Sequence, residues 1–145
     1  MKKILLINGP NLNLLGDREN NIYGKVSLKE IEKVSIDKAK DLKLQLIFEQ
    51  SNSESVIIDL IHKTQKDFDG LIINPAAFTH TSVAILDALR AITKPKIEIH
   101  LSNIYSREEY RKTSITAAAV DGTICGFGQL SYLLAIDAIN NILRS

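Results

Sequence analysis

The fold is predicted outward from Ile4-Leu5-Leu6-Ile7-Asn8-Gly9-Pro10, a short apolar run that stops at a polar turn. Four consecutive apolar residues before such a turn predict a strand that is buried on both faces. The run is too short for a membrane span, which needs about 18 residues, and too short for a secretory signal. We therefore expect a soluble intracellular protein with no membrane partner.

Short apolar runs and helix-length periodic segments alternate along the rest of the chain. Helices are expected at 28–42, 53–68, 82–92 and 131–143, and strands at 44–48, 71–73, 97–100 and 123–125. Ser27 with Glu30 three residues later is a capping-box pattern for the first of these helices. Strands that alternate with helices favour right-handed crossovers and a parallel sheet. For one domain over residues 1–145, the economical fold is α/β: a doubly wound five-stranded parallel sheet in the order 2-1-3-4-5, with helices on both faces.

The composition and motifs of the sequence argue against several classes of function. Lys and Arg number 18 and Asp and Glu number 17, so the net charge of +1 gives no basic excess for nucleic acid. Cys125 is the only cysteine, which excludes an internal disulfide framework and a multi-cysteine metal site. The sequence also has no glycine-rich dinucleotide or phosphate loop.

Three polar segments follow directly after predicted strands, at 8–13, 74–82 and 100–111. The carboxyl ends of parallel strands meet at one edge of a sheet, so these segments can converge on one crevice. They carry asparagines, histidines and arginines. The only lysine near them, Lys112, lies directly after Arg111, a poor position for a Schiff base. This set suits acid–base chemistry on a small anionic, hydroxyl-rich substrate.

The same segments resemble type II 3-dehydroquinate dehydratase. The matching stretches are Asn8-Gly9-Pro10-Asn11-Leu12-Asn13-Leu14-Leu15-Gly16 with Arg18-Glu19 and Tyr23-Gly24, then Asn74-Pro75-Ala76-Ala77-Phe78-Thr79-His80-Thr81-Ser82, and Glu98-Ile99-His100-Leu101-Ser102-Asn103 with Arg107-Glu108 and Arg111. The resemblance implies a flavodoxin-like fold and reversible anti-elimination of water from 3-dehydroquinate through an enolate. It also implies a cytoplasmic dodecamer built from trimers, with neither a metal nor an organic cofactor.

The resemblance also implies roles for individual residues. Tyr23 is the expected base, Arg18 lowers the pKa of Tyr23, and His100 is the expected acid. Glu98 orients His100, and Asn11 holds a water that stabilises the enolate. Substrate binding is expected from Asn74, His80, Leu101, Ser102 and Arg111, and from Asp87 of a neighbouring subunit.

Without the resemblance, ordinary structural roles fit these residues. Arg18 and Tyr23 could be a solvated charge and a packing aromatic, and Glu98 with His100 could be a surface ion pair. Asn11 and Asn74 could make turns, His80 could cap a helix, and Asp87 could be an exposed charge. Two other functions stay open: an acid–base lyase or isomerase for a different cyclic polyhydroxy acid, and a binding module for a flavin or nucleotide.

Two departures from the family pattern are visible. The segment bracketed by Gly16 and Gly24 resembles a lid that closes over substrate, and it has Asn20 where the family often has proline. Ala76 stands where glycine is common, and we expect its extra methyl group to be tolerated.

Overall fold

The computed structural model describes residues 1–16 and 26–145. Arg18, Tyr23 and the predicted lid lie outside the described residues. No helix among the described residues has the length and apolar character needed to cross a membrane.

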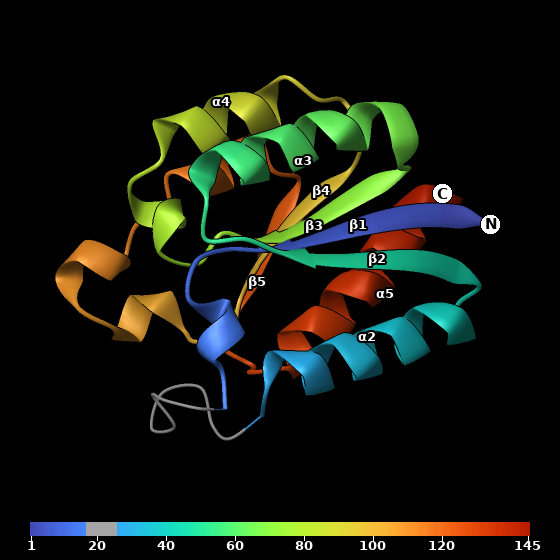
Figure 1. Ribbon diagram of the computed structural model, residues 1–145, viewed down its shortest axis with the longest axis horizontal. Helices are drawn as coiled ribbons and strands as arrows, with labels where there is room; N and C mark the ends of the chain where they lie inside the picture. The colour runs from blue at the N-terminus through green and yellow to red at the C-terminus, as the bar shows by residue number, and fades with distance from the viewer. Residues whose placement is uncertain (17–25) are drawn as a thin grey trace.

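The sheet has five parallel strands, and it confirms the predicted order (Figure 1). The order is β2-β1-β3-β4-β5, with every neighbouring pair parallel. The strands are β1 (Lys2–Asn8), β2 (Leu44–Gln50), β3 (Gly70–Asn74), β4 (Lys96–His100) and β5 (Gly122–Cys125).

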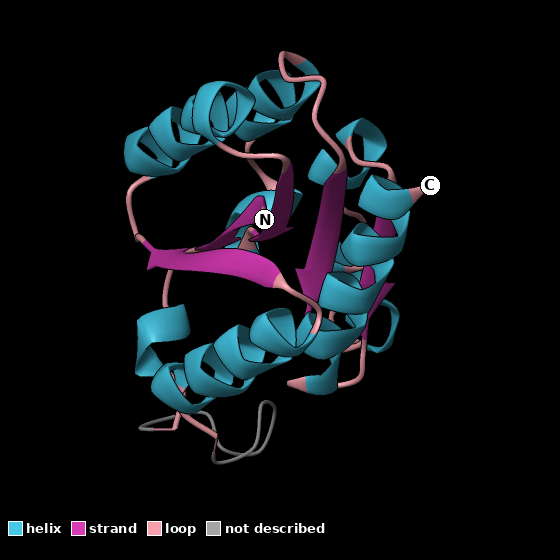
Figure 2. Ribbon diagram, turned by 90° about the vertical axis from the view of Figure 1, so that its right-hand side faces the viewer, coloured by secondary structure: helices cyan, strands magenta, loops and turns pink. Residues whose placement is uncertain are grey.

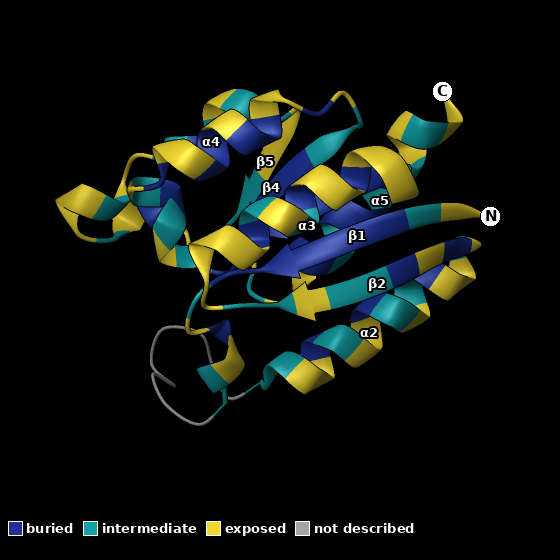
Figure 3. Ribbon diagram, turned by 45° about the horizontal axis from the view of Figure 1, so that its top comes forward, coloured by how far each residue is buried: buried dark blue, intermediate teal, exposed yellow. Residues whose placement is uncertain are grey.

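Helices cover both faces of this sheet (Figure 2). One face carries α2 (Leu28–Asp41) and α5 (Leu130–Arg144), and the other carries α3 (Glu54–Asp67) and α4 (Val83–Arg90). Side chains of β1 alternate between two apolar cores: Ile4 and Leu6 enter one core, and Leu5 and Ile7 enter the other. This alternation explains the unbroken apolar run of β1, which is buried along most of its length in Figure 3.

Serine side chains fix where three helices begin. The backbone N–H of Glu30 donates to Ser27 Oγ at 3.2 Å, which confirms the predicted cap of α2. Ser53 and Ser82 cap α3 and α4 in the same way. The helix predicted at 82–92 is therefore shorter, because Ser82 is its cap and the chain leaves the helix before Pro95.

The order of strands reverses between β1 and β3, whose last residues, Asn8 and Asn74, are in register. The backbone N–H of Gly9 donates to the carbonyl oxygen of Asn74 at 2.8 Å. A Cβ at Gly9 would lie 2.4 Å from the Pro75 carbonyl oxygen, so only glycine lets the two turns approach this closely. The switch point therefore brings the first two polar segments together, where ligands bind in doubly wound folds.

Candidate active site

A cavity of about 380 Å³ opens at the carboxyl edge of the sheet. Its walls come from the three segments that follow β1, β3 and β4, as the sequence predicted. The described residues that line it include no Asp or Glu, whereas two histidines and two arginines are present. The described lining consists of Pro10, Asn11, Leu12, Leu14, Leu15, Asn74, Ala76, Ala77, His80, His100, Leu101, Ser102, Ile104, Arg107 and Arg111. A wall of this composition suits an anionic ligand of small-molecule size.

His100 reaches the cavity from the end of β4, and Glu98 holds it from behind. His100 Nε2 lies 2.8 Å from Glu98 Oε2, and the two residues are 6% and 0% exposed. Residues two apart on a strand point to the same side, so the pairing follows from the sequence. Because Nε2 faces Glu98, Nδ1 is the ring nitrogen left for a ligand.

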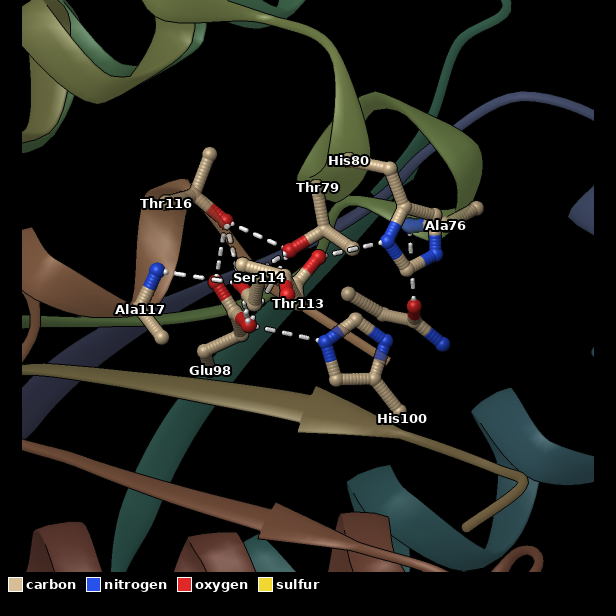
Figure 4. Close-up of polar contacts among 10 residues, drawn as sticks. Ala76, Thr79, His80, Glu98, His100, Thr113, Ser114, Thr116 and Ala117 are labelled. Carbon is tan, nitrogen blue, oxygen red and sulfur yellow. Dashed lines mark hydrogen bonds and ion pairs between the residues drawn. The ribbon is translucent and has the colours of Figure 1, made fainter. Parts of the chain in front are cut away.

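Three hydroxyl groups surround the Glu98 carboxylate (Figure 4). Thr79 and Ser114 donate to Oε2 at 3.1 and 2.7 Å, and Thr116 donates to Oε1. Burial acts to raise the pKa of Glu98, but the hydrogen bond and charge of His100 and the bonds from Thr116 and Ser114 outweigh it. The pKa of Glu98 is therefore lowered, and the carboxylate stays ionised beside the imidazole.

His80 lies on another wall, and its ring orientation is also fixed. Its Nδ1 lies 2.8 Å from the backbone carbonyl oxygen of Thr113 (Figure 4). A carbonyl only accepts, so Nδ1 carries the proton and Nε2 remains for a ligand. This contact joins the turn after β3 to the segment that carries Arg111.

The two arginines are oriented by polar partners. Arg107 Nη1 donates to Ser102 Oγ at 3.3 Å, and Arg111 Nε donates to Glu108 Oε2 at 3.0 Å. The hydrogen bonds from Tyr110 and Arg111 help to lower the pKa of Glu108 to about 2, and the bond to Glu108 raises the pKa of Arg111. Arg111 therefore stays charged at the cavity wall.

The turn after β1 presents Asn11 in a left-handed conformation, with φ of 69°. Asparagine tolerates this conformation better than most residues. The Asn11 N–H donates to Asn52 Oδ1 at 2.9 Å, and Gln50 Nε2 donates to the Gly9 carbonyl at 3.1 Å. The end of β2 thus holds the turn that carries Asn11.

Sequence and structure comparisons agree on one family. The family model described as dehydroquinase class II matches residues 2–140. The chain belongs to the class II dehydroquinase family. A 3-dehydroquinate dehydratase from Carboxydothermus hydrogenoformans is 54% identical over 142 residues, covering 98% of this chain and 92% of that protein. One from Clostridium botulinum is 54% identical over 147 residues, covering 99% of both. The crystal structure of a type II dehydroquinase from Butyrivibrio crossotus has a TM-score of 0.94 at 44% identity, covering 96% of this chain and 97% of that one.

Most of the site residues predicted from the dehydroquinase resemblance lie at this one cavity. Asn11, Asn74, His80, His100, Leu101, Ser102 and Arg111 line it, and Glu98 lies directly behind His100. Asp87 is exposed on α4 and does not line the cavity of its own chain. Arg18 and Tyr23 lie outside the described residues.

Several polar residues that position side chains at this cavity were given no role from the sequence. They are Tyr132, which contacts Asn74, Asn8, which contacts Tyr132, the three hydroxyl residues around Glu98, and Gln50. Tyr132 lies in an apolar helical segment, where an aromatic residue indicates only core packing. The one usable signal was the position of Gln50 at the end of a strand, beside the predicted crevice.

Proposed function

We propose that this protein removes water from 3-dehydroquinate reversibly and gives 3-dehydroshikimate through an enolate. The observation that carries the proposal is His100, held by a buried carboxylate at the wall of a cavity whose described lining has no acidic residue. Membership of the class II dehydroquinase family supports the same reaction. Water loss beside a ketone needs a base, a group that holds the enolate oxygen, and an acid for the departing hydroxyl.

His100 is the proposed acid. In the proposed step the Glu98 carboxylate accepts the Nε2 hydrogen and orients the ring, and Nδ1–H gives its proton to the hydroxyl as the C–O bond breaks. Water leaves, and Nδ1 becomes an acceptor with its lone pair facing the cavity. Glu98 keeps its charge throughout, since its hydroxyl partners satisfy both carboxylate oxygens.

Tyr23 is the proposed base, and this assignment rests on the sequence resemblance. A free tyrosine titrates near pH 10, so action near pH 7 needs a shift of about three units, or ~4 kcal/mol. One charge at 4 Å supplies about 4 kcal/mol at an effective dielectric constant of 20. Arg18 is the proposed source of that charge, and Asn11 is proposed to hold the water that stabilises the enolate.

The remaining polar groups of the cavity are proposed to bind the substrate. Arg111 and the backbone of Leu101 and Ser102 suit its carboxylate, whereas Asn74 and His80 suit its hydroxyl groups. Asp87 is proposed to reach the site of a neighbouring subunit in a cytoplasmic dodecamer. The reaction so described uses no metal, no organic cofactor and no imine.

The deciding experiment follows 3-dehydroshikimate by its ultraviolet absorbance when purified protein is given 3-dehydroquinate. We expect turnover, and we expect His100→Gln to lower kcat by about 100- to 10,000-fold because it removes the acid. His62→Gln, at an exposed position of α3, is the matched control and should retain full activity. Absence of product from the wild-type protein would contradict the proposal, and turnover of another cyclic polyhydroxy acid instead would replace the substrate.

The finer chemistry has two direct tests. Borohydride added with substrate should leave activity intact because no imine forms, and inactivation would instead indicate a lysine mechanism. A chelator should also leave activity intact. Loss of activity that added metal restores would contradict the metal-free reaction.

A further inference from the structure

A chain of buried polar contacts runs beneath the cavity and joins three elements. Tyr132, on α5, donates its hydroxyl hydrogen to Asn8 Oδ1 at 2.6 Å and accepts from Asn74 Nδ2 at 3.0 Å. Asn8 and Tyr132 are 0% exposed and Asn74 is 2% exposed. Of these residues, only Asn74 lines the cavity.

Backbone groups at the two ends fix the direction of every hydrogen bond in this chain. The Glu49 carbonyl can only accept, so the group that faces it at 3.0 Å must be the Asn8 Nδ2–H donor. The Ala76 N–H can only donate, so the group that faces it at 3.1 Å must be the Asn74 Oδ1 acceptor. The phenol between the two amides must then donate to Asn8 and accept from Asn74.

This arrangement leaves the Asn74 side chain one hydrogen-bonding group for a ligand. Its Oδ1 is occupied by Ala76, and one Nδ2 hydrogen is occupied by Tyr132. The second Nδ2 hydrogen is the donor that remains for the cavity. We propose that Tyr132 is a positioning residue that locks the Asn74 amide so that it donates to an oxygen of the substrate.

The inference rests on the proposed function, since it assigns Asn74 to substrate binding. Burial raises the pKa of Tyr132, which keeps its hydroxyl hydrogen available to Asn8 throughout the reaction. The helix α5 packs against β3 and β4, so the phenol oxygen is held in place by the core.

The first experiment is Tyr132→Phe, which removes the hydroxyl and keeps the buried ring. We expect KM for 3-dehydroquinate to rise by about 10-fold, with kcat within about 3-fold of wild type, because one hydrogen bond to bound substrate is lost. A merely structural defect lowers the amount of active enzyme, and so lowers kcat at unchanged KM. Tyr105→Phe, at a tyrosine that is 63% exposed, is the matched control and should change neither constant.

A double-mutant cycle tests whether Tyr132 acts through Asn74. Asn74→Ala should raise KM by itself, and Tyr132→Phe added to it should have no further effect on kcat/KM. Equal effects of Tyr132→Phe in both backgrounds would overturn the inference. If Tyr132→Phe does not fold, Asn8→Ala takes its place in the cycle, because it removes the acceptor that orients the phenol.

A measurement independent of turnover separates failure of this inference from failure of the proposed function. The side-chain amide protons of Asn74 should shift in the nuclear magnetic resonance spectrum of Tyr132→Phe and stay unchanged in Tyr105→Phe. If the wild-type protein forms no product but the Asn74 signals shift in Tyr132→Phe, the proposed substrate is refuted and the positioning role is retained. Unchanged Asn74 signals would overturn the positioning role whatever the activity.

Discussion

Ala76 adopts a backbone conformation that its side chain disfavours. Its φ is +53°, in the left-handed region, and its N–H is held by Asn74 Oδ1. The left-handed conformation costs a non-glycine residue about 1–2 kcal/mol. The extra methyl group, which the sequence analysis expects to be tolerated, therefore carries an energetic cost in the turn after β3.

Replacing Ala76 with glycine should therefore stabilise the protein. We expect Ala76→Gly to raise the free energy of unfolding by about 0.5–1 kcal/mol, after the higher entropy of unfolded glycine is subtracted. For a domain of this size the melting temperature should rise by about 2–4 °C. Ala77→Gly is the matched control and should lower the melting temperature. A melting temperature of Ala76→Gly below that of wild type would contradict the strain argument.

The buried Glu98 carboxylate should make stability depend on pH. Its pKa is lowered in the folded protein, so it contributes stability above the unfolded value, about 4.3, and that contribution is lost as the pH falls through the folded value. We expect Glu98→Gln to destabilise the protein by about 3 kcal/mol at pH 5, and the difference from wild type to shrink at pH 3.

Urea unfolding at the two pH values checks this expectation. Glu109→Gln makes the same change at a glutamate whose side chain is 90% exposed, and it should leave the stability nearly unchanged at both. A Glu98→Gln difference of the same size at pH 5 and pH 3 would show that charge at Glu98 does not stabilise the fold.

Some contacts of the site could be predicted from the sequence, and others could not. Glu98 and His100 are neighbours on one strand, so their pairing follows from the strand period. Asn8 and Tyr132 are hydrogen-bonded although 124 residues separate them in the sequence. Ser114 and Thr116, which donate hydrogen bonds to Glu98, lie in a segment without regular periodicity. No local pattern encodes such contacts, because they depend on how the loops and α5 settle onto the sheet.

Among the helices whose N-caps are serines, α4 begins at the most buried cap. Its cap Ser82 is 3% exposed, accepts from the Ile85 N–H at 2.9 Å, and donates to Glu54 Oε2 at 2.5 Å. The cap of α3 is weaker, since Ser53 is exposed and accepts from the Val56 N–H at 3.4 Å. Because α4 follows the turn that carries His80, its start also anchors one wall of the cavity.

Removing the two caps should have unequal effects. We expect Ser82→Ala to lower the free energy of unfolding by about 1–2 kcal/mol, because it leaves a buried N–H and a carboxylate oxygen without this partner. Ser53→Ala should lower it by about 0.5 kcal/mol. Thermal unfolding of both variants measures the difference, and an equal loss in the two would contradict the role of burial.

The elements themselves were almost wholly predictable. Among residues 1–16 and 26–145, apolar runs and helical periodicity identified the five strands and the four longer helices, with ends displaced by at most two residues. The 3-10 helices at Ile104–Ser106, Glu109–Arg111 and Thr116–Ala119 were not predicted, because turns this short carry no periodicity. That stretch nevertheless supplies Arg107, Arg111 and two of the hydroxyls around Glu98.

At the scale of the whole molecule, the exposed side of α4 is where subunits are expected to meet. Val83 is 57% exposed, and Asp87 lies one turn further along the same exposed side. If Asp87 completes a neighbouring site, each site needs residues from two chains, and activity depends on assembly.

Mixing two defective chains tests this dependence. His100→Gln and Asp87→Ala chains, dissociated and reassembled together, should exceed the mean activity of the two separate variants. Random mixing gives about a quarter of the sites an intact His100 beside an intact Asp87. No gain on mixing would assign Asp87 to its own chain or to the surface.

Sedimentation should give a particle of about 190 kDa, twelve times the chain mass of 16.1 kDa.

Both chain termini lie at the opposite edge of the sheet from the cavity (Figure 1). β1 starts at Lys2 and delivers the cavity turn only at its far end, whereas α5 runs back to finish at Arg144. A seven-residue strand spans about 23 Å, so a tag or surface linker added at the N-terminus begins about that far from the turn that lines the cavity. The protein can therefore be immobilised or labelled through its ends while each chain keeps its own site open to solution.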